Sequence, residues 1–279
     1  MTLRLRLLDT VFEIRTEEDD VAALLGRLWE PFATSEDAPA DAAFTIERDG
    51  SELAVGERGG EPLIRHPDVW GLTDALRYRM LELAEAGLER AVSLHAAAVA
   101  LDGRLLLLAG PSGAGKTTLT LGLLRAGWTY FSDDVAPVDR ATAAILPFPK
   151  PLGVKDPALF DGLASAYAGL DLPRPPKAFL VPASTFPVGR EALPASVLVF
   201  PAFRPGAAPS AAPLTAAKAT ALATPFVRRL DPEVLGLLNR VCGGCDCFDL
   251  VYGSTAGGIE AVTSLVGGAA YEGLRSRDS

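Results

Sequence analysis

The stretch Gly110–Thr117 reads GPSGAGKT, which fits the phosphate-binding loop pattern G-x-x-x-x-G-K-[ST] at every fixed position. An apolar run, Leu105–Ala109, leads into this loop and predicts a buried strand. The run Thr118–Arg125 leaves the loop and predicts a helix. Because a strand, a glycine loop and a helix follow one another in this order, we expect the phosphates of a nucleotide to be the ligand.

The residue types of the loop suit a densely charged anion. Backbone N–H groups at the start of a helix offer donors and a positive dipole end together, and Gly110, Gly113 and Gly115 allow the tight curl that this requires. Lys116 supplies a mobile positive charge, and the Thr117 hydroxyl can bind Mg²⁺. The alternative, a plain glycine-rich turn, would make the Lys-Thr pair and both flanks a coincidence. The residues expected to contact the nucleotide are Gly110, Pro111, Ser112, Gly113, Ala114, Gly115, Lys116, Thr117 and Thr118.

Composition narrows the class of protein. The chain has 279 residues, 49% of them hydrophobic and 22% charged, which predicts a globular protein with a sizeable core. Its net charge of −9 argues against nucleic acid as a partner. No apolar run approaches the length of a membrane span, and the N-terminus lacks the apolar core of a signal peptide. We therefore expect a cytoplasmic protein without a membrane partner.

Two domains are expected from the pattern along the chain. Residues 1–90 mix alternating, strand-like runs with helical spacing and a hairpin turn at Asp49–Gly50, which predicts a small α+β domain. Within it, Thr73–Leu88 predicts a helix that Thr73 can cap. Residues 91–279 hold the glycine loop and predict an α/β domain, in which the Ala- and Pro-rich segment Ala207–Pro213 is expected to be a loop.

An acidic pair follows the loop at short distance. The strand that enters the loop is predicted to be the second arm of a hairpin, and Trp128–Ser132 is predicted to be the next strand after the loop helix. Asp133 and Asp134 come directly after it, 17 residues beyond Lys116 in the case of Asp133. One helix and one returning strand would place both carboxylates beside the loop, where one could hold Mg²⁺ and the other orient an acceptor hydroxyl. The alternative is a turn in which an aspartate caps the next element.

The three cysteines are Cys242, Cys245 and Cys247. A structural zinc site uses four ligands, and neither histidine of the chain is near them in sequence. A redox or metal role stays an alternative, but we expect small buried residues at a junction between a loop and a strand, with Cys245 and Cys247 on one face.

These motifs resemble the HPr serine kinase/phosphorylase family, specifically its catalytic domain. The resemblance rests on Leu94–His95, the hairpin into the loop, the acidic pair, and the segment Pro147–Lys155, and it covers about residues 91 to 270. The segment Cys245–Tyr252 is similar to HPr-kinase-related proteins of peptide-modification gene clusters. The family implies a P-loop core of the HPr kinase / PEP carboxykinase type.

The resemblance also implies roles for single residues. Lys116 and the loop amides would bind the phosphates of ATP, Thr117 and Asp134 would serve Mg²⁺, and Asp133 would act as the base at the acceptor hydroxyl. His95 stands where the family has a histidine close to the phosphates; its alternative is a packed strand histidine. Lys150 and Lys155 are candidates for stabilising charge on the transferred group, or else ordinary solvated lysines.

The implied activity is transfer of a phosphoryl group from ATP to a serine of a peptide or small protein, and the family hints at homo-oligomers. The family's glycine-rich segment with a glutamate and an arginine is absent after the acidic pair, and residues 1–90 do not match the family's N-terminal domain, so HPr is a poor guess for the substrate. The alternatives are a small-molecule kinase with the same loop and a nucleotide-binding regulatory ATPase.

Overall fold

The computed structural model describes residues 1–35, 39–57, 60 and 62–268, and it shows a mixed α/β chain. The chain forms two compact units. The first unit contains Met1–Glu89 and Lys150–Thr185, and the second contains Arg90–Pro149 and the described residues from Phe186 onward. The segment 150–185 therefore lies with the N-terminal residues, whereas we expected residues 91–279 to form one domain.

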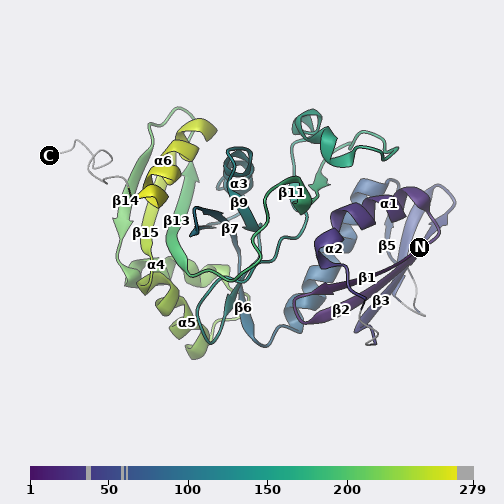
Figure 1. Cartoon of the computed structure of the whole chain (residues 1–279), viewed down its shortest axis with the longest axis horizontal. Coiled ribbons are helices and arrows are strands. Elements are labelled where there is room, and N and C mark those ends of the chain that lie inside the picture. The colour runs from purple at the N-terminus through teal and green to yellow at the C-terminus, as the bar shows by residue number, and fades with distance from the viewer. Residues whose placement is uncertain (36–38, 58–59, 61, 269–279) are drawn as a thin grey trace. The chain divides into compact units, whose positions relative to one another are not determined.

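A five-stranded sheet in the order β1-β2-β3-β4-β5 forms the core of the first unit (Figure 1). Only the β2–β3 pair is parallel among its pairings. Helices α1 (Asp19–Leu28) and α2 (Val69–Ala86) pack on the sheet and on each other, with Leu24, Leu25 and Leu76 fully buried. The strands are β1 (Thr2–Leu7), β2 (Thr10–Thr16), β3 (Ala42–Asp49), β4 (Glu52–Glu57) and β5 (Pro62–His66), and a 3₁₀ turn, η1, spans Glu30–Phe32.

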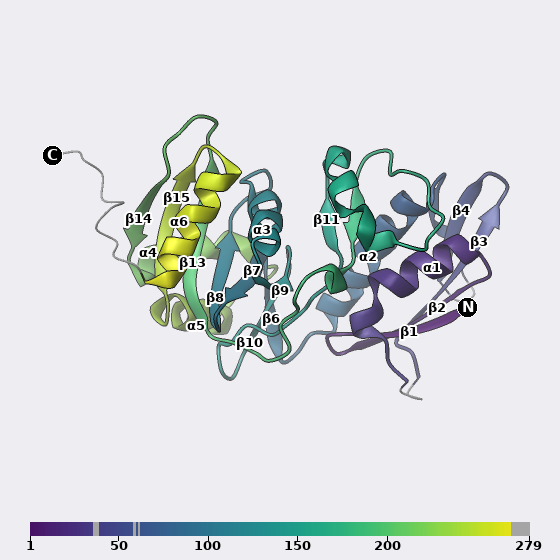
Figure 2. The ribbon, with the colours of Figure 1, turned by 45° about the horizontal axis from the view of Figure 1, so that its top comes forward.

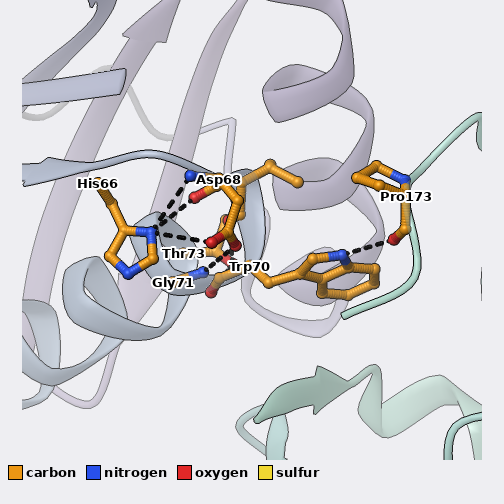
Figure 3. A network of polar contacts seen from close by, with 7 residues as sticks. His66, Asp68, Trp70, Gly71, Thr73 and Pro173 are labelled. Atoms are coloured by element: carbon orange, nitrogen blue, oxygen red, sulfur yellow. Dashed lines mark hydrogen bonds and ion pairs between the residues drawn. The ribbon is translucent and has the colours of Figure 1, made fainter. Parts of the chain in front are cut away.

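Helix α2 begins earlier than its pattern predicted. Asp68 is its N-cap: the Asp68 carboxylate accepts a hydrogen bond of 3.0 Å from the Gly71 N–H. The cap predicted at Thr73 is wrong, because Thr73 lies inside the helix and its hydroxyl donates to the Val69 carbonyl at 2.9 Å. His66 leans against this start, with Nδ1 3.3 Å from Asp68 Oδ2 (Figure 3).

Aromatic side chains attach the segment 150–185 to the first unit. The Trp70 ring of α2 meets Phe160 and Tyr167 edge-on at centroid distances of 5.8 and 5.2 Å. Its indole N–H donates to the Pro173 carbonyl at 2.8 Å (Figure 3). These contacts explain why the segment groups with α2. Its own elements are β11 (Leu152–Val154), η2 (Pro157–Leu159), η3 (Asp161–Tyr167), β12 (Phe179–Val181) and η4 (Ala183–Thr185).

A six-stranded sheet in the order β14-β15-β13-β8-β7-β9 organises the second unit. Strands β15, β13 and β8 are mutually parallel, and β7 is antiparallel to both β8 and β9, so β9 runs in the direction of β8. The strands are β7 (Ala96–Leu101), β8 (Arg104–Ala109), β9 (Thr129–Ser132), β13 (Ala195–Phe203), β14 (Ser210–Leu214) and β15 (Asp246–Tyr252); a separate pair joins β6 (Ala91–Leu94) and β10 (Ala136–Asp139).

Helices cover both faces of this sheet. Helices α3 (Lys116–Arg125) and α6 (Thr255–Gly267) lie on one face, and α4 (Ala216–Ala223) and α5 (Pro232–Gly243) lie on the other (Figure 2). Leu105 and Leu107 of β8 belong to the core that α4 and α5 close. Every residue from Leu105 to Ala109 is fully buried, which confirms the buried strand predicted before the loop. A 3₁₀ turn, η5 (Thr224–Phe226), follows α4.

The loop predicted at Ala207–Pro213 is partly wrong, because Ser210–Leu214 forms β14 and pairs with β15. Only one proline, Pro213, lies within β14, and an edge strand is the place in a sheet where proline is tolerated, because half of its N–H groups face away from the sheet. Within the described ranges, no helix is both long and apolar enough to cross a membrane.

Candidate active site

Strand register brings three separate segments to one edge of the second unit's sheet. Ala96 at the start of β7 pairs with Ala109 at the end of β8, and Ala98 pairs with Ser132 at the end of β9. The glycine loop leaves β8 at this edge, and the acidic pair leaves β9 at the same edge. Ligands of open α/β sheets bind at the carboxyl ends of strands, so this edge is the candidate site.

The backbone of the loop is shaped by two glycines in the left-handed region. Gly113 has φ +86° and Gly115 has φ +90°, and Gly115 is the N-cap of α3. Because the N-cap is a glycine, it has no side chain to bond the first turn of α3, and N–H groups at such a helix start are suited to bind an anion. Pro111–Gly113 and Thr118 are exposed, and Thr117 is half-buried. The strand, loop and helix thus have the order that the sequence predicted.

Close packing explains why a glycine is required at position 115. A Cβ at Gly115 would overlap the Tyr252 hydroxyl oxygen and would lie 3.4 Å from Phe203 Cβ. A Cβ at Gly113 would meet open space, so only the positive φ calls for glycine there. A Cβ at Gly110 would lie 3.4 Å from Ala114 Cβ and 3.7 Å from Pro201 Cδ, which are ordinary van der Waals contacts. The ends of β13 and β15 therefore back the loop.

Lys116 folds over the beginning of its own loop. Its Nζ donates to the Gly110 carbonyl at 2.7 Å and to the Pro111 carbonyl at 3.2 Å. Lys116 is only 5% exposed. Its ammonium group therefore stays at the loop, and the two carbonyl oxygens take the place of the water that it loses on burial. An anion in the loop would offer this ammonium stronger, charged acceptors.

The acidic pair forms the turn between β9 and β10. The Val135 N–H donates to the Asp133 carbonyl at 2.8 Å, and the Ser132 hydroxyl donates to the Val135 carbonyl. Asp134 has φ +62°, a conformation that aspartate tolerates better than most residues. The Asp133 side chain is fully buried, whereas Asp134 is half-buried. The two carboxylates thus have different surroundings.

His95 lies beside the acidic turn. The pairs Ala98–Ser132 and Leu94–Ala136 flank both bends, so residues 95–97 run opposite residues 133–135. His95 Nδ1 is 2.9 Å from the Asp134 carbonyl oxygen. A carbonyl only accepts, so Nδ1 carries a proton and Nε2 of the neutral ring is left as an acceptor. The ring is exposed, which sets it apart from a packed strand histidine.

Two further candidates from the sequence are lysines. Lys150 and Lys155 belong to the first unit; Lys150 is fully buried, so it is not an ordinary solvated lysine, and Lys155 is exposed. Among the described residues, no group of three or more His, Cys, Asp or Glu side chains could hold a metal ion.

The cysteines lie at the opposite end of β15 from the site. Cys247 is the second residue of this strand and Tyr252 ends it. Cys245 lies just before the strand, and its sulfur is 3.8 Å from that of Cys247, so the two side chains lie on the same side as expected. Cys242 and Cys247 are buried. Interaction with Cys247 and burial raise the pKa of the Cys242 thiol, which disfavours the reactive thiolate.

Two aromatic residues at the site were not singled out from the sequence. Phe203 ends β13 and Tyr252 ends β15, and these residues are paired in the sheet. Their positions at the carboxyl ends of parallel strands were the signal that could have found them. Burial raises the pKa of Tyr252, so this phenol remains protonated and polar behind the loop.

A scan against models of protein families found no match to this chain, and a search of curated proteins found none either. The chemistry of the site is therefore inferred from its own residues.

Proposed function

We propose that this protein is an ATP- and Mg²⁺-dependent kinase that phosphorylates a serine of a peptide or small protein, on a P-loop core of the HPr kinase type. One observation carries the proposal. The glycine loop and the turn Asp133–Asp134 leave strands that run in the same direction, and β7 with its preceding His95 lies between them. Phosphoryl transfer needs a phosphate cradle and carboxylates at one place.

The phosphates would bind at the loop. The first turn of α3 and the exposed backbone of Ser112 and Gly113 supply N–H donors, and Lys116 supplies the charge. The Tyr252 hydroxyl is a second polar feature at the loop. It is buried directly behind Gly115 and has no hydrogen-bond partner among the described residues. These features support anion binding independently of the sequence pattern.

The oxygen donors at this edge fit Mg²⁺. Thr117 lies in the first turn of α3 and Asp134 in the turn after β9, and both are partly accessible. Mg²⁺ in such sites keeps several waters and takes only one or two protein ligands beside the phosphates, so the lack of a larger cluster among the described side chains agrees with it. The ion would neutralise charge on the phosphate oxygens.

Asp133 is the proposed base that accepts the proton of the serine hydroxyl. Its carboxylate is fully covered in the structure, so this role requires the covering residues to move when substrate binds. His95, held through Nδ1 by the Asp134 carbonyl, presents a polar ring edge beside the same turn. We assign it to positioning of the phosphates rather than to the proton transfer.

The test is transfer of label from γ-labelled ATP, with Mg²⁺, to serine peptides encoded beside the gene. Matched peptides with each serine replaced by alanine serve as substrate controls, and Lys116→Ala serves as the loop control. We expect label on serine that disappears with the alanine peptides and with Lys116→Ala. Label on small metabolites alone would favour a small-molecule kinase, and release of free phosphate alone would favour a regulatory ATPase; either result would overturn the proposal.

A further inference from the structure

We propose that Phe203 is a stacking platform for the nucleobase, so that the site takes a nucleoside triphosphate rather than a bare polyphosphate. This inference rests on the proposed function in that it places phosphates in the glycine loop. It adds the part of the site that holds the other end of the nucleotide.

The position of Phe203 follows from the sheet. Strand β13 is the parallel neighbour of β8, and Val199 pairs with Leu108, so β13 continues past the point where β8 turns into the loop. Phe203 is the last residue of β13, and its Cβ lies 3.4 Å from the Cβ position that Gly115 leaves empty. The aromatic side chain thus starts directly beside the loop.

The exposure of Phe203 is unusual for its type. Phe203 is 45% exposed, and the only other exposed phenylalanine, tyrosine or tryptophan in the described ranges is Tyr78 of the first unit. Tyr78 has a partner on its ring, because the Arg77 guanidinium lies 4.2 Å from the ring centroid. An exposed aromatic face at the carboxyl edge of a sheet is the kind of surface on which a planar base stacks.

The Phe203 ring is held in place from behind. The buried Tyr252 ring meets it edge-on, with centroids 5.5 Å apart and an interplanar angle of 60°. The next residue, Arg204, donates its backbone N–H to the Tyr252 carbonyl at 2.9 Å. Both contacts fix the end of β13 against β15. A platform that is already ordered loses little conformational entropy when a base binds.

The chemistry of the platform sets its selectivity. A phenyl ring has no hydrogen-bonding group, and every base has a π face, so stacking on Phe203 favours nucleotides over polyphosphate without distinguishing adenine from guanine.

The experiment compares binding of Mg-ATP and Mg-tripolyphosphate by calorimetry for the full chain and its variants. Tripolyphosphate has the phosphates without a base. We expect Phe203→Ala and Phe203→Leu to weaken ATP binding by about tenfold while tripolyphosphate binding stays unchanged. Phe203→Trp should retain ATP binding. Tyr78→Ala, which removes the other exposed ring, should change neither affinity.

The outcomes separate this inference from the proposed function. If Phe203→Leu, which keeps apolar bulk and hence the fold, binds ATP as tightly as the wild type, the platform is disproved while the phosphate site stands. Equal weakening of ATP and tripolyphosphate binding by Phe203→Leu would likewise disprove it. If the wild-type protein binds neither ligand, the phosphate site itself fails, and the platform fails with it.

Discussion

Two constraints require glycine at position 115, a positive φ and the lack of space for a Cβ, whereas only the positive φ applies at Gly113. Both glycines have a positive φ near +90°, but only a Cβ at Gly115 would overlap the Tyr252 hydroxyl. Gly113→Ala is therefore expected to cost about 1–2 kcal/mol for the left-handed conformation alone. Gly115→Ala is expected to cost clearly more, because the overlap adds to the same backbone strain.

The effect of both substitutions on local stability can be measured by amide hydrogen exchange of residues 104–125, which cover β8, the loop and α3. Adding Tyr252→Phe removes the overlapping oxygen, so the double variant Gly115→Ala/Tyr252→Phe should recover the excess and behave like Gly113→Ala. Equal protection in the Gly113→Ala and Gly115→Ala variants would show that Tyr252 does not back the loop.

At the scale of elements, the start of α2 gives a second expectation. Asp68→Ala removes the cap on the Gly71 N–H and should destabilise the helix by about 1 kcal/mol, with faster exchange at the Gly71 amide. Asp68→Asn keeps a side-chain acceptor and should keep that protection. Thr73→Val has the same shape as the wild-type residue and should leave the Gly71 amide unchanged, because Thr73 bonds only carbonyls inside the helix.

If Thr73→Val exposes the Gly71 amide as much as Asp68→Ala does, the assignment of the cap is wrong. The comparison also shows why the sequence misplaced this helix start. The apolar stripe that begins at Leu76 suggested Thr73 as the boundary, but Val69, Trp70 and Leu72 are buried as well and extend the helix by another turn.

Elements with a strong local pattern were predictable from the sequence. The strand Arg104–Ala109, the glycine loop and the helix that follows are confirmed, because an unbroken apolar run and adjacent glycines leave few other conformations. The edge strand β14 was missed because it depends on long-range pairing with β15, and its Ala- and Pro-rich sequence has no pattern that predicts a strand. Phe203 and Tyr252 were missed for the same reason: only the sheet brings them to the loop.

At the scale of the whole molecule, the division into two units depends on contacts that cross a long stretch of chain. Trp70 holds η3 and the Pro173 carbonyl to α2, across about a hundred residues of sequence. Such pairings could not be inferred from local patterns, which is why residues 150–185 were expected elsewhere. The same contacts make Trp70 the key side chain of that attachment.

Trp70→Ala is expected to cost about 3–5 kcal/mol in the first unit, since it removes a fully packed aromatic side chain and orphans the Pro173 carbonyl. Hydrogen exchange should rise in β11, β12 and η3 together with α2, while β8 and α3 of the second unit keep their protection. Trp128→Ala, a buried tryptophan of the second unit, should give the reverse pattern. Uniform loss of protection over the whole chain in both variants would show that the two units are not separate folding units.

The central claim, phosphoryl transfer with Asp133 as the base, is tested most directly by single-turnover transfer from labelled ATP to a serine peptide by Asp133→Asn. Asp102→Asn is the matched control, because Asp102 lies in the β7–β8 turn at the far end of the hairpin and asparagine also tolerates its φ of +48°. We expect Asp133→Asn to bind ATP with nearly wild-type affinity but to transfer at least about 100-fold more slowly, with Asp102→Asn unchanged. Transfer by Asp133→Asn at nearly the wild-type rate would contradict the account.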